Sequence, residues 1–143
     1  MKKVAVKRMM QVPAEAAWKV ISRITGLEEY HPGIYNSILT NDEVAMRTTV
    51  TNNGNTYTET ILRLDSRAME LLYDIQDPSP LPYSNFTGFI KIVPVNMISC
   101  EIRWAAVFRP GTPNEDEAVQ LIEKDIHSCI DGLEKYCRVV QAN

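Results

Sequence analysis

The sequence predicts an α+β protein in which a seven-stranded antiparallel sheet curls around one long C-terminal helix. Three observations support this prediction. Apolar and polar residues alternate through most of residues 34 to 109, which is typical of half-buried strands. Residues 115 to 140 instead place apolar side chains at helical spacing. One helix is too narrow for so wide a sheet, so we expect its concave face to hold a cavity or a plug of large side chains.

Size, charge and composition indicate a single domain over residues 1–143. The net charge of -3, without a run of Lys or Arg, gives no reason to expect nucleic acid as a partner. No apolar stretch approaches the roughly 18 residues of a membrane span, and the N-terminus lacks the apolar core of a signal peptide. We therefore expect a cytoplasmic protein. The 3 cysteines form no CxxC pair and are expected to be reduced core residues.

The N-terminal region is predicted to contain one strand and two short helices. The first ten residues alternate loosely and indicate the strand. In the segment VPAEAAWKVISRITG, Ala14, Trp18 and Ile21 share a helical face, and Gly26 suits a C-terminal stop. A second short helix is expected over residues 27 to 30, before His31-Pro32-Gly33 ends it.

The central region is predicted to be a meander of antiparallel strands joined by short turns. The strands are expected near residues 34–40, 44–51, 56–64, 68–75, 84–93 and 97–109. The turns carry typical tight-turn residues at Asn41-Asp42, Asn53-Gly54, Asp65-Ser66 and Val95-Asn96. The exception is DPSPLPYSNF at residues 77–86, a stiff loop with three closely spaced prolines.

Alternation assigns the inward-facing residues of the later strands. They are Met69, Leu71, Tyr73 and Ile75, then Phe86, Gly88, Ile90 and Ile92, then Cys100, Ile102, Trp104, Ala106 and Phe108. Gly88 stands among large apolar residues, and its missing side chain is expected to leave space or to admit a ligand or a bulge.

One carboxylate falls on the inward side of the predicted strand YTETILRL. If Tyr57 and Ile61 face inward, so does Glu59. A buried carboxylate is costly unless it is paired or protonated, which makes Glu59 a candidate polar anchor in a pocket. The alternative is a register shifted by one residue, which places Glu59 at the rim or on the surface.

Three segments resemble a known family in the expected order along essentially the whole chain. VPAEAAWKVISRITGLEEYHPGI resembles the N-terminal signature of the START-like, Bet v 1-like (SRPBCC) superfamily, in its bacterial polyketide cyclase/dehydrase branch. DPSPLPYSNF resembles a loop of that branch, and CEIRWAAVFRPG resembles its penultimate strand. The resemblance implies a helix-grip fold with a deep hydrophobic cavity between the sheet and the last helix.

The resemblance also implies where a ligand binds. In receptor-like members, the loop that matches Leu81-Pro82-Tyr83 is a latch over the cavity mouth. Stiff prolines lower the entropy lost when such a lid adopts one shape, although they also suit a loop that only avoids strand pairing. Asn36 stands where plant abscisic-acid receptors have a lysine, so a ligand carboxylate held by that cation is not expected.

Together, alternation and the resemblance predict a set of ligand-binding residues. They are Asn36, Glu59, Ile61, Met69, Leu71, Tyr73, Leu81, Pro82, Tyr83, Phe86, Gly88, Ile90, Ile102, Trp104, Ile122, Cys129 and Leu133.

No catalytic motif stands out in the sequence. No metal-binding pattern, GxSxG or Gly-rich phosphate loop occurs, so no metal and no cofactor are expected. His31 is interpreted as a turn residue and His127 as a solvent-facing one. The remaining acid/base candidates are Glu59, Tyr73 and Tyr83 around an apolar cavity.

Three functions remain open. The favoured one is binding of a small hydrophobic molecule, such as a lipid or polyketide-like compound, by a carrier or sensor. The second is a cofactor-independent polyketide cyclase, aromatase or dehydratase that uses the same cavity. The third is a protein-interaction module whose cavity is filled by Trp104, Phe86, Met69 and Tyr73. Phe89 and Val107 mark a candidate surface for a weak homodimer, and otherwise a monomer is expected.

Overall fold

A computed structural model describes the chain except residues 42, 44, 112, 113 and 143. Its elements in chain order are β1 (Lys2–Met10), α1 (Ala14–Ile21), a 3-10 turn η1 (Leu27–Glu29), β2 (Ile34–Asn41), β3 (Met46–Thr51), β4 (Thr56–Asp65), β5 (Glu70–Ile75), β6 (Tyr83–Pro94), β7 (Cys100–Pro110) and α2 (Glu115–Ala142).

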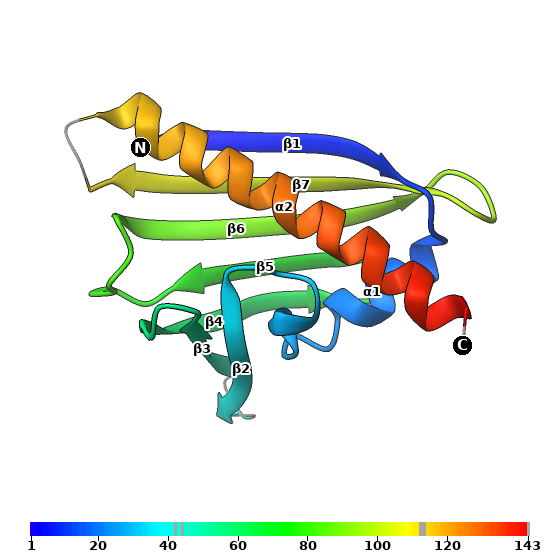
Figure 1. Cartoon of the computed structure of the whole chain (residues 1–143), viewed down its shortest axis with the longest axis horizontal. Coiled ribbons are helices and arrows are strands. Elements are labelled where there is room, and N and C mark those ends of the chain that lie inside the picture. The colour runs from blue at the N-terminus through cyan, green and yellow to red at the C-terminus, as the bar shows by residue number, and fades with distance from the viewer. Residues whose placement is uncertain (42, 44, 112–113, 143) are drawn as a thin grey trace.

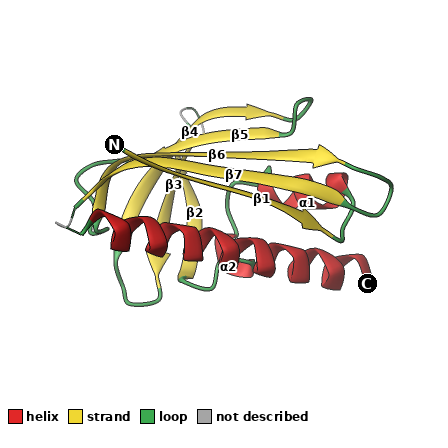
Figure 2. Cartoon of the chain, turned by 90° about the horizontal axis from the view of Figure 1, so that it is seen from above, coloured by secondary structure: helices red, strands yellow, loops and turns green. Residues whose placement is uncertain are grey.

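The strands form one antiparallel sheet in the order β1-β7-β6-β5-β4-β3-β2. Strands β2 to β7 follow one another as a meander, and β1 closes the sheet beside β7. In Figure 1, α2 runs diagonally across one face of this sheet, and Figure 2 shows the sheet and α2 as two layers with α1 at one end. The predicted α+β helix-grip architecture is confirmed.

Several predicted boundaries shift. The second short helix is a single 3-10 turn that covers Leu27–Glu29. Met69, predicted on a strand, has a φ of 55° and lies in the turn before β5, because the hairpin pairs Asp65 with Glu70 and encloses residues 66–69. The predicted start of the last strand at Met97 lies in the β6–β7 loop, where Met97 is 90% exposed. The predicted Asn41-Asp42 turn involves Asp42, which lies outside the described residues, as does Val44 of the following predicted strand.

The turn at Asn53-Gly54 forms, with one more residue than a two-residue hairpin. The Thr51 N–H donates to the Asn55 carbonyl at 2.8 Å, which encloses residues 52 to 54, and Gly54 has a φ of 87°. A three-residue hairpin loop commonly places a glycine in this left-handed conformation. The loop fixes the β3–β4 register and pairs Arg47 with Glu59.

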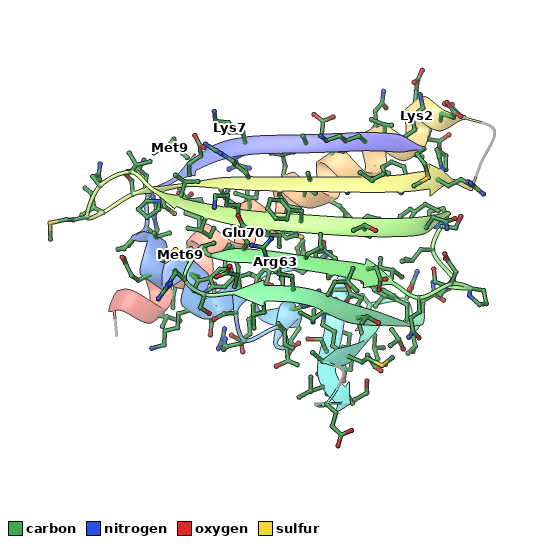
Figure 3. The ribbon with its side chains drawn as sticks, turned by 180° about the vertical axis from the view of Figure 1, so that it is seen from behind. Lys2, Lys7, Met9, Arg63, Met69 and Glu70 are labelled. Carbon is green, nitrogen blue, oxygen red and sulfur yellow. The ribbon has the colours of Figure 1, made fainter. Side chains whose placement is uncertain are left out.

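The two faces of the sheet differ in chemistry. One end of the concave face is closed by α1 and α2 over fully buried side chains, among them Met10, Ile21, Ile92, Ile102 and Leu133. The convex face carries ion pairs, including Arg63–Glu70 at 3.0 Å and Lys91–Glu70 at 3.1 Å. Figure 3 views this back face and shows Lys7, Arg63 and Glu70 on it. Exposed ion pairs of this kind add little stability, so the fold depends on the concave side.

Register irregularities in the sheet match its curvature. They occur between Ile34 and Asn36, between Ile61 and Arg63, and between Ser84 and Thr87. Bulges of this type bend a strand and increase its local twist. The sheet therefore curls toward α2.

Within the described residues, the helices include none that is both long and apolar enough to cross a membrane.

Cys100, Cys129 and Cys137 are all buried and form no disulfide bond. Burial raises the pKa of the Cys100 and Cys137 thiols to about 11, which makes them poor nucleophiles.

Helix α2 meets the segment after η1 at Gly132. The Asn114 side chain accepts a hydrogen bond from the Glu117 N–H at 3.1 Å, and the acidic first turn of α2 complements the helix dipole. Further along, a Cβ atom on Gly132 would lie 2.0 Å from the Tyr30 carbonyl oxygen. Only glycine permits this contact between the helix and the backbone that carries Tyr30 and His31.

We predict that Gly132→Ala destabilises the protein, although Gly→Ala inside a helix ordinarily stabilises it by about 0.5–1 kcal/mol. The clash with the Tyr30 carbonyl should lower the free energy of unfolding by at least about 2 kcal/mol. Urea denaturation measures the change, with Glu123→Ala on the exposed side of α2 as the control. Unchanged or increased stability of Gly132→Ala would contradict the prediction.

Candidate ligand-binding cavity

A cavity of about 180 Å³ lies between the concave face of the sheet and α2. Its wall receives side chains from the η1 region, strands β2 to β7, the β5–β6 loop and the N-terminal half of α2. The predicted binding residues that line it are Glu59, Leu71, Tyr73, Leu81, Tyr83, Phe86, Ile90, Trp104, Ile122 and Cys129.

The structure places the other predicted binding residues away from the cavity wall. Asn36 is exposed on β2, and Pro82 is exposed on the outer side of the β5–β6 loop. Ile61, Ile102 and Leu133 are buried in packed parts of the core, and Met69 lies in the turn before β5. Ile102 and Leu133 lie where α1 and α2 pack against each other and against the sheet, so these two residues contact protein rather than open space.

Gly88 does not open space in the cavity. A Cβ atom on Gly88 would lie 2.3 Å from Cζ of Tyr73, its cross-strand neighbour on β5. The aromatic ring of Tyr73 therefore covers the glycine, which corrects the expectation that Gly88 admits a ligand. The glycine instead allows a large aromatic side chain to lie flat against the sheet.

Aromatic side chains form one wall of the cavity. Ring centroids are 6.0 Å apart for Tyr73 and Phe86, and 5.3 Å apart for Tyr83 and Phe86. The Trp104 Nε1–H donates to the Tyr73 hydroxyl at 3.3 Å. Tilted pairs at these separations are favourable, and they hold the rings in fixed orientations around the cavity.

In contrast to these aromatic rings, another part of the cavity wall contains a buried ion pair between Arg47 on β3 and Glu59 on β4. Arg47 Nε and Nη2 donate to the two Glu59 carboxylate oxygens at 2.9 and 3.1 Å, and both side chains are about 5% exposed or less. The Thr49 hydroxyl donates to Glu59 at 3.0 Å, and Arg47 Nη1 donates to the Ile24 carbonyl at 2.6 Å. The Arg47 guanidinium also lies over the Tyr73 ring, 5.3 Å from its centroid. Of the two alternatives for Glu59, the structure shows the inward one, with the residue 4% exposed.

Burial and charge set the ionisation of the cavity wall. Burial disfavours the charged form of Arg47, but the adjacent Glu59 carboxylate more than offsets this and raises the pKa of Arg47. Burial raises the pKa of Tyr57, Tyr73 and Tyr83 well above that of an exposed phenol. These tyrosines are therefore neutral hydrogen-bonding groups, not bases.

Residues at the cavity opening are partly exposed. They include His31 after η1, Tyr57 at the start of β4 and Asp125 on α2. Burial lowers the pKa of His31, and its Nδ1 accepts a hydrogen bond from the Gly33 N–H at 3.1 Å. This bond leaves the proton of the neutral ring on Nε2. His31 thus occupies a turn, as predicted, and also lines the cavity.

His127 differs from its predicted position in solvent. Its Nδ1 lies 3.1 Å from Arg8 Nη1, and Arg8 also binds Asp131 at 2.6 Å. The imidazole is partly buried between β1 and α2, because β1 forms the edge of the sheet that α2 crosses. It does not line the cavity.

The β5–β6 loop borders the cavity and is held at both ends. The Asn85 N–H donates to the Asp77 carboxylate at 2.9 Å, and the Gly111 N–H donates to the Pro82 carbonyl at 2.9 Å. Leu81 of this loop and Tyr83 at the start of β6 both line the cavity. The loop is thus positioned to cover the opening.

Arg47 and Asp125 line the cavity but were not predicted from the sequence. Arg47 was hidden because MRTTVT has no apolar alternation, although Arg47 and Thr49 fall on one face. A correct hairpin register would have placed Arg47 opposite Glu59. Asp125 carried no signal, since acidic residues on a helix are usually solvated.

Over the described part of the chain, His, Cys, Asp and Glu side chains do not gather into a group of three or more that could hold a metal ion.

The fold and this cavity define a helix-grip protein with an internal, mostly apolar chamber. The chain belongs to the "Polyketide cyclase / dehydrase and lipid transport" family, whose sequence profile matches residues 1–138. No functionally curated protein matches the sequence significantly.

Solved structures show the same fold at low sequence identity. XoxI from Bacillus cereus has a TM-score of 0.88 at 19% identity, with 99% of each chain covered. A START superfamily protein from Mycobacterium smegmatis has a TM-score of 0.81 at 12% identity, with 99% of each chain covered. The ZhuI aromatase/cyclase from Streptomyces sp. R1128 has a TM-score of 0.79 at 14% identity, over 96% of this chain and 93% of ZhuI.

We predict strong coupling between Arg47 and Glu59. Arg47→Met or Glu59→Leu alone should lower the free energy of unfolding by about 3–5 kcal/mol, because each leaves a buried charge without its partner. The double variant should lose less than either single variant, because both charges are then absent. A double-mutant cycle measured by urea unfolding tests this, and additive losses would show that the pair is not coupled.

A second prediction concerns the packing of Tyr73 on Gly88. Gly88→Ala should lower the free energy of unfolding by about 1–3 kcal/mol, because the new methyl group displaces the Tyr73 ring. In a Tyr73→Ala background the same substitution should cost less than about 0.5 kcal/mol, because the ring is gone. Thermal and urea unfolding of the four proteins measure this difference. Equal costs in both backgrounds would exclude the proposed packing role.

Proposed function

We propose that this protein binds a small hydrophobic molecule in its internal cavity, as a carrier or sensor. The observation that carries the proposal is a preformed chamber of about 180 Å³ with largely apolar and aromatic walls. Each methylene group transferred from water into such a chamber contributes about 0.8 kcal/mol. The family description, which includes lipid transport, supports the same class of ligand.

The size of the chamber limits what it holds as it stands. An engineered apolar cavity of about 150 Å³ binds benzene, so a chamber of this size suits a compact ring system. A longer lipid or polyketide-like molecule needs additional space. We propose that the β5–β6 loop supplies it by moving as a latch, with Leu81 closing over the ligand beside Tyr83 at the start of β6, and with the prolines restricting the loop to few conformations.

Native mass spectrometry tests this function with a matched pair of variants. Ile122 lines the cavity and is 4% exposed, whereas the adjacent Leu121 is 46% exposed on the solvent side of α2. Ile122→Trp should fill the chamber and remove any co-purifying apolar compound, together with the thermal stabilisation given by added hydrophobic compounds. Leu121→Trp should retain both.

The proposal would be contradicted if wild-type protein carried no compound and a broad panel of hydrophobic molecules left its melting temperature unchanged. Equal ligand retention by folded Ile122→Trp and by Leu121→Trp would place binding elsewhere.

A second candidate function is cyclisation or dehydration of a molecule bound in the same cavity. The observation that favours it is that the Tyr57 and Tyr83 hydroxyls line the cavity without a hydrogen-bond partner among the described protein groups. Such hydroxyls are able to orient a carbonyl oxygen and to stabilise charge that develops on it. The ZhuI neighbour is an aromatase/cyclase, and the family description includes polyketide cyclases. Phe86, which lacks a hydroxyl, contributes no such group.

For this second function, we predict that Tyr83→Phe lowers turnover of a poly-β-ketone substrate by about 10-fold or more, through loss of one hydrogen bond to the transition state. Its melting temperature should stay within a few degrees of wild type. Turnover is followed by chromatography of the products, with Tyr35→Phe, exposed on β2, as the control. If neither wild type nor either variant converts the substrate, the carrier or sensor function stands alone.

The third function, an interaction module with a filled cavity, receives no support from the geometry. Trp104, Phe86 and Tyr73 stand around the chamber rather than filling it, and Met69 lies outside it.

A further inference from the structure

The buried ion pair determines the charge that a bound molecule encounters. Arg47 supplies a guanidinium to the cavity wall, the type of group that ordinarily binds carboxylates. Here both carboxylate oxygens of Glu59 already take two of its nitrogens, at 2.9 and 3.1 Å. The positive charge that a ligand anion would need is therefore cancelled within the protein.

The other charged group of the wall has the same sign as an anionic ligand. Among the described residues that line the cavity, Glu59 and Asp125 are acidic and Arg47 is basic. His31 adds no positive charge near neutral pH, because burial lowers the pKa of its imidazole. An entering carboxylate would pass Asp125 and lose its hydration without gaining a free cation.

A cationic ligand is no better matched. Its charge would lie beside the Arg47 guanidinium, and the Glu59 carboxylate that would balance it is already occupied by Arg47 and Thr49. Asp125 is exposed at the opening, where solvent screens its charge.

Polar but uncharged groups find partners on this wall. Tyr57 and Tyr83 line the cavity, and their hydroxyls donate to no other protein group among the described residues. A ligand carbonyl, ether or hydroxyl oxygen satisfies such donors without bringing in a charge.

We infer that the cavity selects uncharged ligands with acceptor oxygens, and that Glu59 is the specificity-determining residue because it cancels Arg47 and so excludes carboxylates. This inference rests on the proposed hydrophobic-ligand function and narrows its ligand class. Asn36 does not determine the charge selection, because it is exposed on β2 and does not line the cavity. The cavity wall contains the cationic guanidinium of Arg47, and its ion pair with Glu59 determines the selectivity against charged ligands.

Probes matched in shape test the inference on the wild-type protein. The neutral probe is 2-naphthamide and the anionic probe is 2-naphthoate, compared at about pH 8, where a carboxylic acid is fully ionised. The cationic probe is 2-naphthylmethylammonium. Isothermal titration calorimetry should show the amide binding at least about tenfold more tightly than either charged probe, because a charge in the chamber lacks a partner.

Variants then test the role of Glu59. Glu59→Gln keeps the side-chain shape and leaves Arg47 without its counter-charge, so the affinity for 2-naphthoate relative to 2-naphthamide should rise at least about tenfold. The double variant Arg47→Met/Glu59→Leu removes both charges and should keep the wild-type preference for the amide. Asp125→Asn, at an exposed position, should raise naphthoate affinity only a few-fold.

The outcomes separate this inference from the proposed function. If wild type binds naphthoate or the ammonium probe as tightly as the amide, the inferred selection of uncharged ligands is wrong. The proposed binding of hydrophobic molecules is then still supported. If folded Glu59→Gln gains no relative affinity for naphthoate, Glu59 is not the determinant. Should Glu59→Gln fail to fold, a double variant that binds naphthoate as well as the amide overturns the inference. If the amide and a panel of other neutral apolar compounds all fail to bind, both proposals fall.

Discussion

A single helix cannot cover a seven-stranded sheet. This difference in width determines how the sheet bends, where the core packs tightly and where a cavity remains. The sheet bends toward α2 at register irregularities, and α1 closes one end of the trough. Large side chains such as Ile102 and Leu133 pack completely at that end. At the other end, the trough retains a chamber of about 180 Å³. The cavity is thus the part of the space between the concave face and α2 that side chains do not fill.

The close contact at Gly132 defines one border of the chamber. Because this residue has no side chain, the Tyr30 carbonyl approaches the backbone of α2 directly. Tyr30 and His31, which both line the chamber, are held in place by that contact. On the sheet side, Gly88 has a comparable role, since it lets the Tyr73 ring lie against β6. Two glycines therefore position aromatic groups on opposite walls, and neither one itself creates open space.

The charged groups in the chamber wall form their hydrogen bonds and balance their charges within the protein. Arg47 binds Glu59 and the Ile24 carbonyl, and Glu59 also accepts from Thr49. Such a pair contributes little net stability compared with an apolar replacement, whereas breaking it is costly. The charge selection that we infer gives this pair a role in the chamber wall other than stability. The tyrosine hydroxyls have the complementary role, because they remain available to an uncharged partner.

Local patterns were enough to determine the fold class, the strand order in the chain and the long amphipathic helix, because side-chain periodicity directly reflects which face is buried. Alternation also offered the inward position of Glu59 as one of two alternatives, and the family resemblance predicted Leu81 and Tyr83 beside the cavity. Tertiary structure decided the rest. The three-residue loop at Gly54 set the register that joins Arg47 to Glu59, and helix packing separated Ile102 and Leu133 from the chamber. These features depend on distances between segments remote in the chain, which alternation along a single strand does not encode.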